Sequence, residues 1–208
     1  MTQFPPTAFA AILYYVSSAL ATRLGDQPRD AAGAEQIYFA SWGTATTVND
    51  LPPERAEQAL QLDPLFEPAY FTLGVQAAQR NENQDAAWYF LFAAFLNQDD
   101  IAAWANTCVL FIGQLNEKSS VSLESAVFAR AYQVHGPSLE EEFIKSATGP
   151  SISTAKARER AKALVELARK CEALYPEPSS SFFRMPDLKH PEANGGFWMS
   201  RDSVPDIL

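Results

Sequence analysis

The sequence is poor in the residues from which most catalytic and metal centres are built. Its 208 residues include only two histidines and two cysteines. Neither histidine has a Cys, His or carboxylate at metal-ligand spacing, and no glycine-rich phosphate-binding loop is present. Cys108 and Cys171 are too few and too far apart for a disulfide framework. The sequence therefore predicts no metal site and no cofactor.

The chain also lacks a long apolar run and an excess of basic residues. The apolar stretch from Ala8 to Val16 is too short to span a bilayer and has no Lys or Arg before it, so neither a membrane span nor a signal peptide is expected. The net charge of -9 opposes long-range attraction to nucleic acids and to anionic membranes. We therefore expect a cytoplasmic protein with protein partners, no nucleic-acid partner and no membrane insertion.

Apolar residues are abundant, at 47% of the chain, and 12% of the residues are aromatic, which is enough to build a substantial core. The stretch 67–96 predicts two helices joined by a hinge at 81–83. Tyr70, Leu73, Gly74 and Ala77 recur at helical spacing on the first of them. Gly74 lets the second helix approach, and Ala86 does the same from the other side, so a packed helical hairpin is expected.

The pattern of this hairpin recurs along the chain. Trp104 and Cys108 each lie 34 residues after their counterparts in the hairpin, Tyr70 and Gly74, and a period of this length indicates a helical repeat. The hairpin resembles the tetratricopeptide repeat, which has a large aromatic residue and Leu-Gly in its first helix and Ala, Phe and Ala in its second. The proline that this family has near the end of each repeat is matched by Pro64 but not by Gln98. The resemblance implies an all-α, right-handed solenoid of about three helical hairpins that binds peptides.

Four parts of the chain are expected. Residues 1–32 form an N-terminal helix and turn, 33–137 the three tetratricopeptide-like repeats, 138–175 two C-terminal capping helices, and 176–208 a tail rich in proline and aromatic residues. Individual helices are predicted at 53–62, 67–80, 84–96, 101–115, 139–146 and from Ser153 or Thr154 to Tyr175.

The two ends of the chain carry apolar residues that need a partner. The N-terminal helix has one apolar stripe, formed by Phe9, Ile12, Leu13, Val16 and Leu20. This helix is expected to lie on the repeats; the alternative is a dimerisation arm that joins two copies of the chain. The tail is too apolar for a solvated segment and is expected to dock within the chain or on a partner.

In tetratricopeptide proteins the first helix of each repeat lines a concave groove. The resemblance implies ten groove residues here: Ile37, Tyr38, Ser41, Phe71, Thr72, Val75, Gln79, Asn106, Val109 and Ile112. None is Lys or Arg, whereas a bound carboxylate would need charge-assisted partners. The small and apolar walls instead favour an apolar segment of a protein client, extended or helical. The alternative is that the chain's own N-terminal helix or tail fills the groove.

The chain resembles the bacterial type III secretion chaperones that hold membrane-inserting translocator proteins. The shared features are three repeats, an N-terminal helix, a negative net charge and an uncharged groove. The stretch from Phe90 to Phe111 is similar to their second and third repeats. This resemblance implies a non-catalytic cytoplasmic chaperone that shields an apolar client segment. Two alternatives are a structural subunit that uses the convex face and the tail, and an enzyme on a helical scaffold that uses His135 or the acidic cluster at Glu140.

Overall fold

The computed structural model describes residues 28–43, 45–112, 127, 130–132, 134–150 and 152–174, together with residues 16 and 20. Within this part of the chain all regular structure is helical, apart from one isolated β-bridge between Gly149 and Ile152. The α-helices are α2 (Ala31–Ala40), α3 (Pro53–Leu62), α4 (Glu67–Gln79), α5 (Asn83–Leu96), α6 (Ile101–Ile112), α8 (Pro137–Ala147) and α9 (Thr154–Leu174). Two short 3-10 helices, η1 (Ser41–Gly43) and η2 (Val48–Asp50), lie between α2 and α3. The expected all-α class is therefore confirmed.

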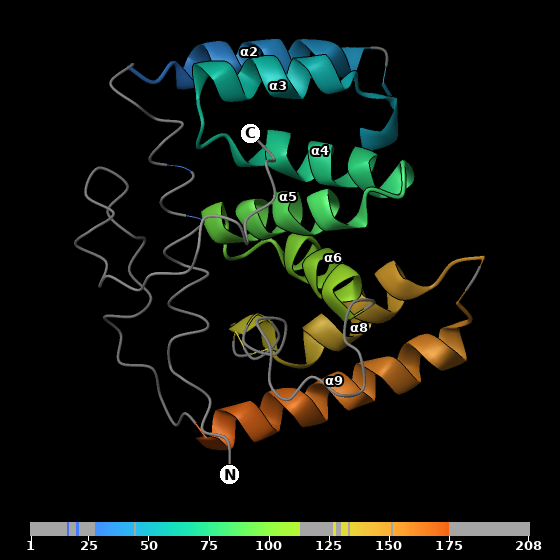
Figure 1. Ribbon diagram of the computed structural model, residues 1–208. Helices are drawn as coiled ribbons and strands as arrows, with labels where there is room; N and C mark the ends of the chain where they lie inside the picture. The colour runs from blue at the N-terminus through green and yellow to red at the C-terminus, as the bar shows by residue number, and fades with distance from the viewer. Residues whose placement is uncertain are drawn as a thin grey trace.

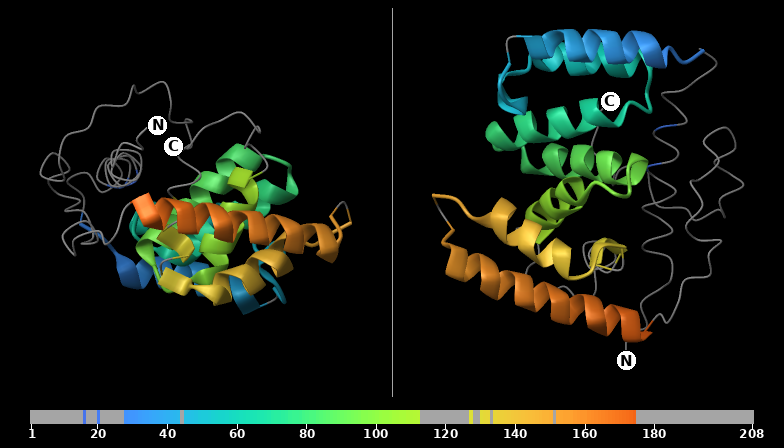
Figure 2. Two further views of the ribbon diagram at one scale, coloured as in Figure 1. Left: turned by 90° about the horizontal axis from the view of Figure 1, so that it is seen from below. Right: turned by 180° about the vertical axis from the view of Figure 1, so that it is seen from behind.

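The helices are stacked in chain order, and each long helix lies against the next one along the chain (Figure 1). The first helices α2 and α4 run in one direction, and α3 and α5 run back (Figure 1). The view from behind shows the same succession from α2 at one end to α9 at the other (Figure 2, right). Turns between consecutive helices therefore gather along two opposite edges of the stack.

The hairpin of α4 and α5 is the most closely packed pair. A Cβ atom placed on Gly74 would lie 2.9 Å from Cδ1 of Phe90, so only glycine allows this approach. Phe90 is 2% exposed and forms a buried cluster with Ala77 and Ala86. The turn between the helices contains Asn81 at φ 61°, a left-handed conformation that asparagine tolerates better than most residues. The predicted roles of Gly74 and Ala86 are confirmed.

The last two described helices close the far end of the stack. The α8 helix has proline in its first turn and buries Leu139 and Phe143. Ser153 precedes α9, and its Oγ accepts from the Lys156 N–H at 3.3 Å, so it acts as the helix cap. The apolar face of α9 is buried, at Ala157, Ala161 and Leu164. Both helices agree with the predicted bounds to within about two residues.

The first helix of the stack begins earlier than expected. The first repeat was expected to begin at residue 33, but α2 starts at Ala31. Asp30 caps this helix, because its side chain accepts the Gly33 N–H at 2.8 Å. The second helix of the third repeat is described only at 127, 130–132 and 134–135, all of them helical, so its bounds stay a prediction. The tail 176–208 lies outside the described residues.

Adding one methyl group at Gly74 tests the hairpin contact. We expect Gly74→Ala to lower the free energy of unfolding by about 1–3 kcal/mol, because the Phe90 ring must move out of a filled core. Gly43→Ala is the matched control, since a Cβ there would meet no heavy atom within 4 Å. Urea denaturation followed by circular dichroism measures both; equal midpoints for the two variants would contradict the close approach.

Candidate functional site

The predicted groove residues lie on the first helices α2, α4 and α6 and at the start of η1. Two of them link neighbouring helices directly. The hydroxyl groups of Tyr38 and Thr72 are 2.7 Å apart, across a separation of 34 residues in the sequence. Residue 106 follows Thr72 by the same interval on α6. The 34-residue period seen in the sequence is therefore also a spatial register between α2 and α4.

The ten predicted residues differ in their exposure. Tyr38 and Thr72 are 4% and 0% exposed, so their side chains join α2 to α4 and are not open to a ligand. Gln79, the last residue of α4, is exposed. Six residues are partly exposed: Ile37, Ser41, Phe71, Val75, Asn106 and Val109. The side chain of Ile112 lies outside the described residues.

The partly exposed members rest on the core and not on loops. The Phe71 ring meets the Phe90 ring edge to face, with centroids 5.3 Å apart. Val75 lies against the same buried cluster, and Val109 against the main core. The Ser41 hydroxyl donates to the Tyr38 carbonyl. These contacts hold four of the six side chains in place, which is a requirement for a preformed binding surface.

The turns before α4 and α6 are built alike. Asp63 and Asn97 end α3 and α5 in nearly the same extended conformation, at φ -139°, ψ 99° and φ -129°, ψ 92°. In both turns the side-chain Oδ1 accepts a main-chain N–H from two residues on, from Leu65 at 3.0 Å and from Asp99 at 3.3 Å. Short polar side chains at this position thus satisfy the turn and set the entry of the next helix.

An aromatic residue in the next helix anchors each of these turns. Tyr70 donates its hydroxyl to the Pro64 carbonyl at 3.0 Å, and Trp104 donates Nε1–H to the Gln98 carbonyl at 3.1 Å. Gln98 stands where the tetratricopeptide pattern has proline, and its Oε1 accepts from Arg130 at 2.7 Å. The departure from the pattern therefore adds a hydrogen bond to the following helical segment.

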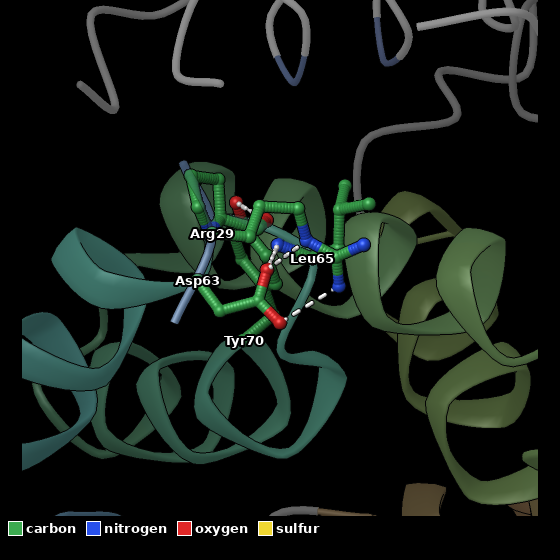
Figure 3. Close-up of polar contacts among 5 residues, drawn as sticks. Arg29, Asp63, Leu65 and Tyr70 are labelled. Atoms are coloured by element: carbon green, nitrogen blue, oxygen red, sulfur yellow. Dashed lines mark hydrogen bonds and ion pairs between the residues drawn. The ribbon is translucent and has the colours of Figure 1, made fainter. Parts of the chain in front are cut away.

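The turn before α4 is also tied to the chain before α2 (Figure 3). Arg29 donates to both carboxylate oxygens of Asp63, through Nε at 2.6 Å and Nη2 at 2.8 Å. Burial alone would raise the pKa of Asp63, but the hydrogen bonds from Arg29 and Leu65 hold it below its usual value. Sequence reasoning missed this pair, although its 34-residue spacing matches the repeat.

A second carboxyl group at this edge has no such cation. Glu67 is the first residue of α4. Asp100 precedes α6, and its Oδ1 accepts hydrogen bonds from the N–H groups of Ala102 and Ala103 at 2.9 and 3.1 Å. Burial, reinforced by the neighbouring Asp100 carboxyl, raises the pKa of Glu67 to about 7. The junction between the two hairpins therefore gains charge as the pH passes neutrality.

The residues proposed for an enzyme are His135, two residues before α8, and the acidic cluster at Glu140, inside α8. Burial lowers the pKa of His135, although Gln98 and the carboxylates of Asp99 and Asp100 oppose this shift, so the imidazole favours its neutral form. In the acidic cluster, Glu142 binds Lys145 at 3.0 Å. Among the described residues, no group of three or more His, Cys, Asp or Glu could hold a metal ion.

Two residues of the N-terminal stripe are described, and both lie in the core. Val16 and Leu20 are helical, 0% and 1% exposed, and belong to the main hydrophobic cluster. These two side chains therefore pack within the chain, which favours the expected N-terminal helix on the repeats over a dimerisation arm. The other residues of the stripe lie outside the described part, as does the tail.

Removing the two hydroxyl groups between α2 and α4 tests the register. Tyr38→Phe and Thr72→Val should each cost about 1–3 kcal/mol of stability, because each leaves its buried partner without a hydrogen bond. The double variant should cost less than their sum, by about 0.5–1.5 kcal/mol. Tyr38→Phe combined with Thr148→Val, which removes an exposed hydroxyl just after α8, is the control pair and should be additive. Urea denaturation measures all these variants. If the effects of Tyr38→Phe and Thr72→Val are additive, the two hydroxyl groups do not interact, and the register between α2 and α4 is contradicted.

The pH dependence of stability tests the Glu67–Asp100 junction. A carboxyl group whose folded pKa is about 7, against an ordinary value of 4.5, stabilises the fold fully below pH 4.5, and this stabilisation is lost as the pH rises through 7. Glu67→Gln keeps the neutral form, so its melting temperature should exceed that of the parent at pH 8 and equal it at pH 4.5. Glu57→Gln, exposed on α3, is the control. Parallel melting curves for parent and Glu67→Gln across this range would refute the shift.

Comparisons with known proteins assign no family. The sequence matches no protein-family model, and searches of curated proteins and of solved structures find no match. No described helix combines the length and apolarity that a bilayer crossing requires. The function must therefore be inferred from the chain's own residues.

Proposed function

We propose that the chain is a non-catalytic, tetratricopeptide-like solenoid that binds an apolar segment of another protein on the face formed by α2, α4 and α6. The observation that carries the proposal is the hydrogen bond between Tyr38 and Thr72. This bond aligns the first helices of two consecutive hairpins at the repeat interval. First helices aligned side by side form the inner surface of helical-repeat proteins.

The chemistry of this face supports an apolar client. Ile37, Phe71, Val75 and Val109 are apolar and partly exposed, and Asn106 supplies an uncharged polar group among them. Burying a carboxylate or ammonium group costs on the order of several kcal/mol in lost hydration. Uncharged side chains do not offset this cost, so a charged client segment would bind poorly. An apolar segment gains affinity from burial instead, at about 25 cal/mol per Å² of apolar surface.

A chaperone role follows from the same chemistry. A client segment that is apolar enough for this face would aggregate or enter a membrane if it were left exposed. Binding that segment lowers the concentration of the free form by mass action. We therefore propose a secretion-type chaperone that acts in the cytoplasm, with the client's apolar segment held across the three first helices. Neither a metal ion nor a cofactor is required by this role.

Charge substitutions on the face test the proposal. A fluorescein-labelled 15-residue peptide with apolar residues at alternate positions should bind with a Kd of about 1–100 μM, and a peptide with those residues changed to serine should not. Val75→Glu should weaken binding at least about tenfold, which corresponds to 1.4 kcal/mol, because the new carboxylate would be buried beside the peptide. Fluorescence anisotropy measures both. The control is Gln58→Glu, exposed on α3, which should bind like the parent.

A second variant guards against a folding defect, since Val75 also contacts the buried cluster of α4 and α5. Asn106→Asp adds the same charge with almost no change in volume and should also weaken binding. Circular dichroism and thermal melting verify that each variant is folded. Unchanged peptide affinity in both folded variants would remove the face of α2, α4 and α6 as the binding surface.

A further inference from the structure

Two side chains with buried polar atoms follow the Tyr38–Thr72 contact by one helical turn. Trp42 is in η1, four residues after Tyr38, and Gln76 is in α4, four residues after Thr72. The helices α2 and α4 run in the same direction (Figure 1). From the helical period we therefore infer that Trp42 and Gln76 face the same seam between the two helices. The rings of Tyr38 and Trp42 lie 6.3 Å apart, as this arrangement requires.

The polar atoms of the pair are complementary and unbonded. Gln76 is 5% exposed, and its Nε2 donates to the Leu51 carbonyl, which leaves Oε1 as a buried acceptor without a partner among the described residues. The Trp42 Nε1–H is a buried donor that meets the full geometry of a hydrogen bond with no described residue, although it lies close enough to the Tyr38 hydroxyl to oppose the rise that burial causes in the pKa of Tyr38. Leaving two such groups unpaired costs about 1–3 kcal/mol each. A native core does not normally sustain that loss at two neighbouring positions.

The orientation of the Gln76 amide is fixed by its surroundings. Turning the amide over would place its oxygen against the Leu51 carbonyl, so that two acceptors would face each other. Oε1 must therefore remain the free atom. The Tyr38 hydroxyl provides a third polar group, because it lies close to Trp42 as well as to Thr72.

We propose that Trp42 and Gln76 bind one water molecule between the first and second hairpins. The water oxygen accepts from Trp42 Nε1–H, and one water hydrogen is donated to Gln76 Oε1. The other hydrogen points to the Tyr38 hydroxyl. Three hydrogen bonds are the usual number for a buried water, and no charged side chain is needed to hold a neutral ligand. This site stands apart from client binding, since its polar atoms are buried.

The bound water has a structural consequence for the first hairpin. Gln76 already binds the chain just after η2, and the water adds a bond to η1. The whole connection between α2 and α3 is then attached to α4 at both of its ends. Loss of the Gln76 acceptor should release η1 while the Tyr38–Thr72 bond remains.

Nuclear magnetic resonance of the full chain tests the site through the indole N–H of Trp42. Trp42→Phe identifies its signal among the four tryptophans. We expect a cross-peak between this proton and a long-lived water in the parent protein. Gln76→Met, which keeps the side-chain length but removes the acceptor, should abolish the cross-peak and speed exchange of the indole proton about tenfold or more. Gln79→Met, exposed on the same helix, is the control and should change neither.

A crystal structure of the parent protein provides an independent readout if Gln76→Met does not fold. Density for a water within about 2.7–3.2 Å of both Trp42 Nε1 and Gln76 Oε1 would support the site. A direct bond between the two side chains, with no water cross-peak, would overturn it. So would an indole proton that exchanges freely in the parent.

Discussion

The contact between Gly74 and Phe90 is the constraint on which the architecture depends. Two helices can approach this closely only where one of them has a glycine at the contact. The Phe90 ring fills the space beside Gly74 that a side chain would otherwise occupy. The resulting α4–α5 hairpin is the middle unit of the stack, with α3 on one side and α6 on the other. Its geometry therefore sets the direction in which the neighbouring hairpins continue.

The turns transmit this geometry along the chain. Asp63 and Asn97 adopt the same extended conformation, and an aromatic residue in the following helix anchors the carbonyl of the next residue in each turn. The two turns therefore start α4 and α6 in the same way. The Tyr38–Thr72 bond links α2 to α4 at the 34-residue interval. The proposed client surface is thus a consequence of repeated local geometry, and no separate fold element is needed to build it.

Most of the helical pattern could be predicted from the sequence, because it depends on local spacing and on glycine and proline. The α4–α5 hairpin, the start of α3 at Pro53 and the cap of α9 at Ser153 are of this kind. The predicted boundary after residue 32 lies beyond the true start of α2, because Asp30 suits a turn as well as a helix cap. A short polar residue serves both purposes, and only the position of the next helix distinguishes them.

The candidate site was harder to predict, because exposure depends on neighbours that are distant in sequence. Tyr38 and Thr72 have the spacing of groove residues, but mutual contact buries them. Gln76 and Trp42 carry the same 34-residue spacing and were overlooked, since neither stands at a position of the repeat pattern. Charge was equally hard to place: the sequence does not reveal that Arg29 binds Asp63 while Glu67 faces Asp100.

Hydrogen exchange read out by mass spectrometry, with and without a saturating apolar peptide, tests the central claim most directly. Amide protection reports where a ligand stabilises the chain against local opening. The account predicts that peptide slows exchange in α2, α4 and α6 and leaves the polar outer helix α3 unchanged. Protection confined to α3, α8 or α9, with the first helices unaffected, would contradict it.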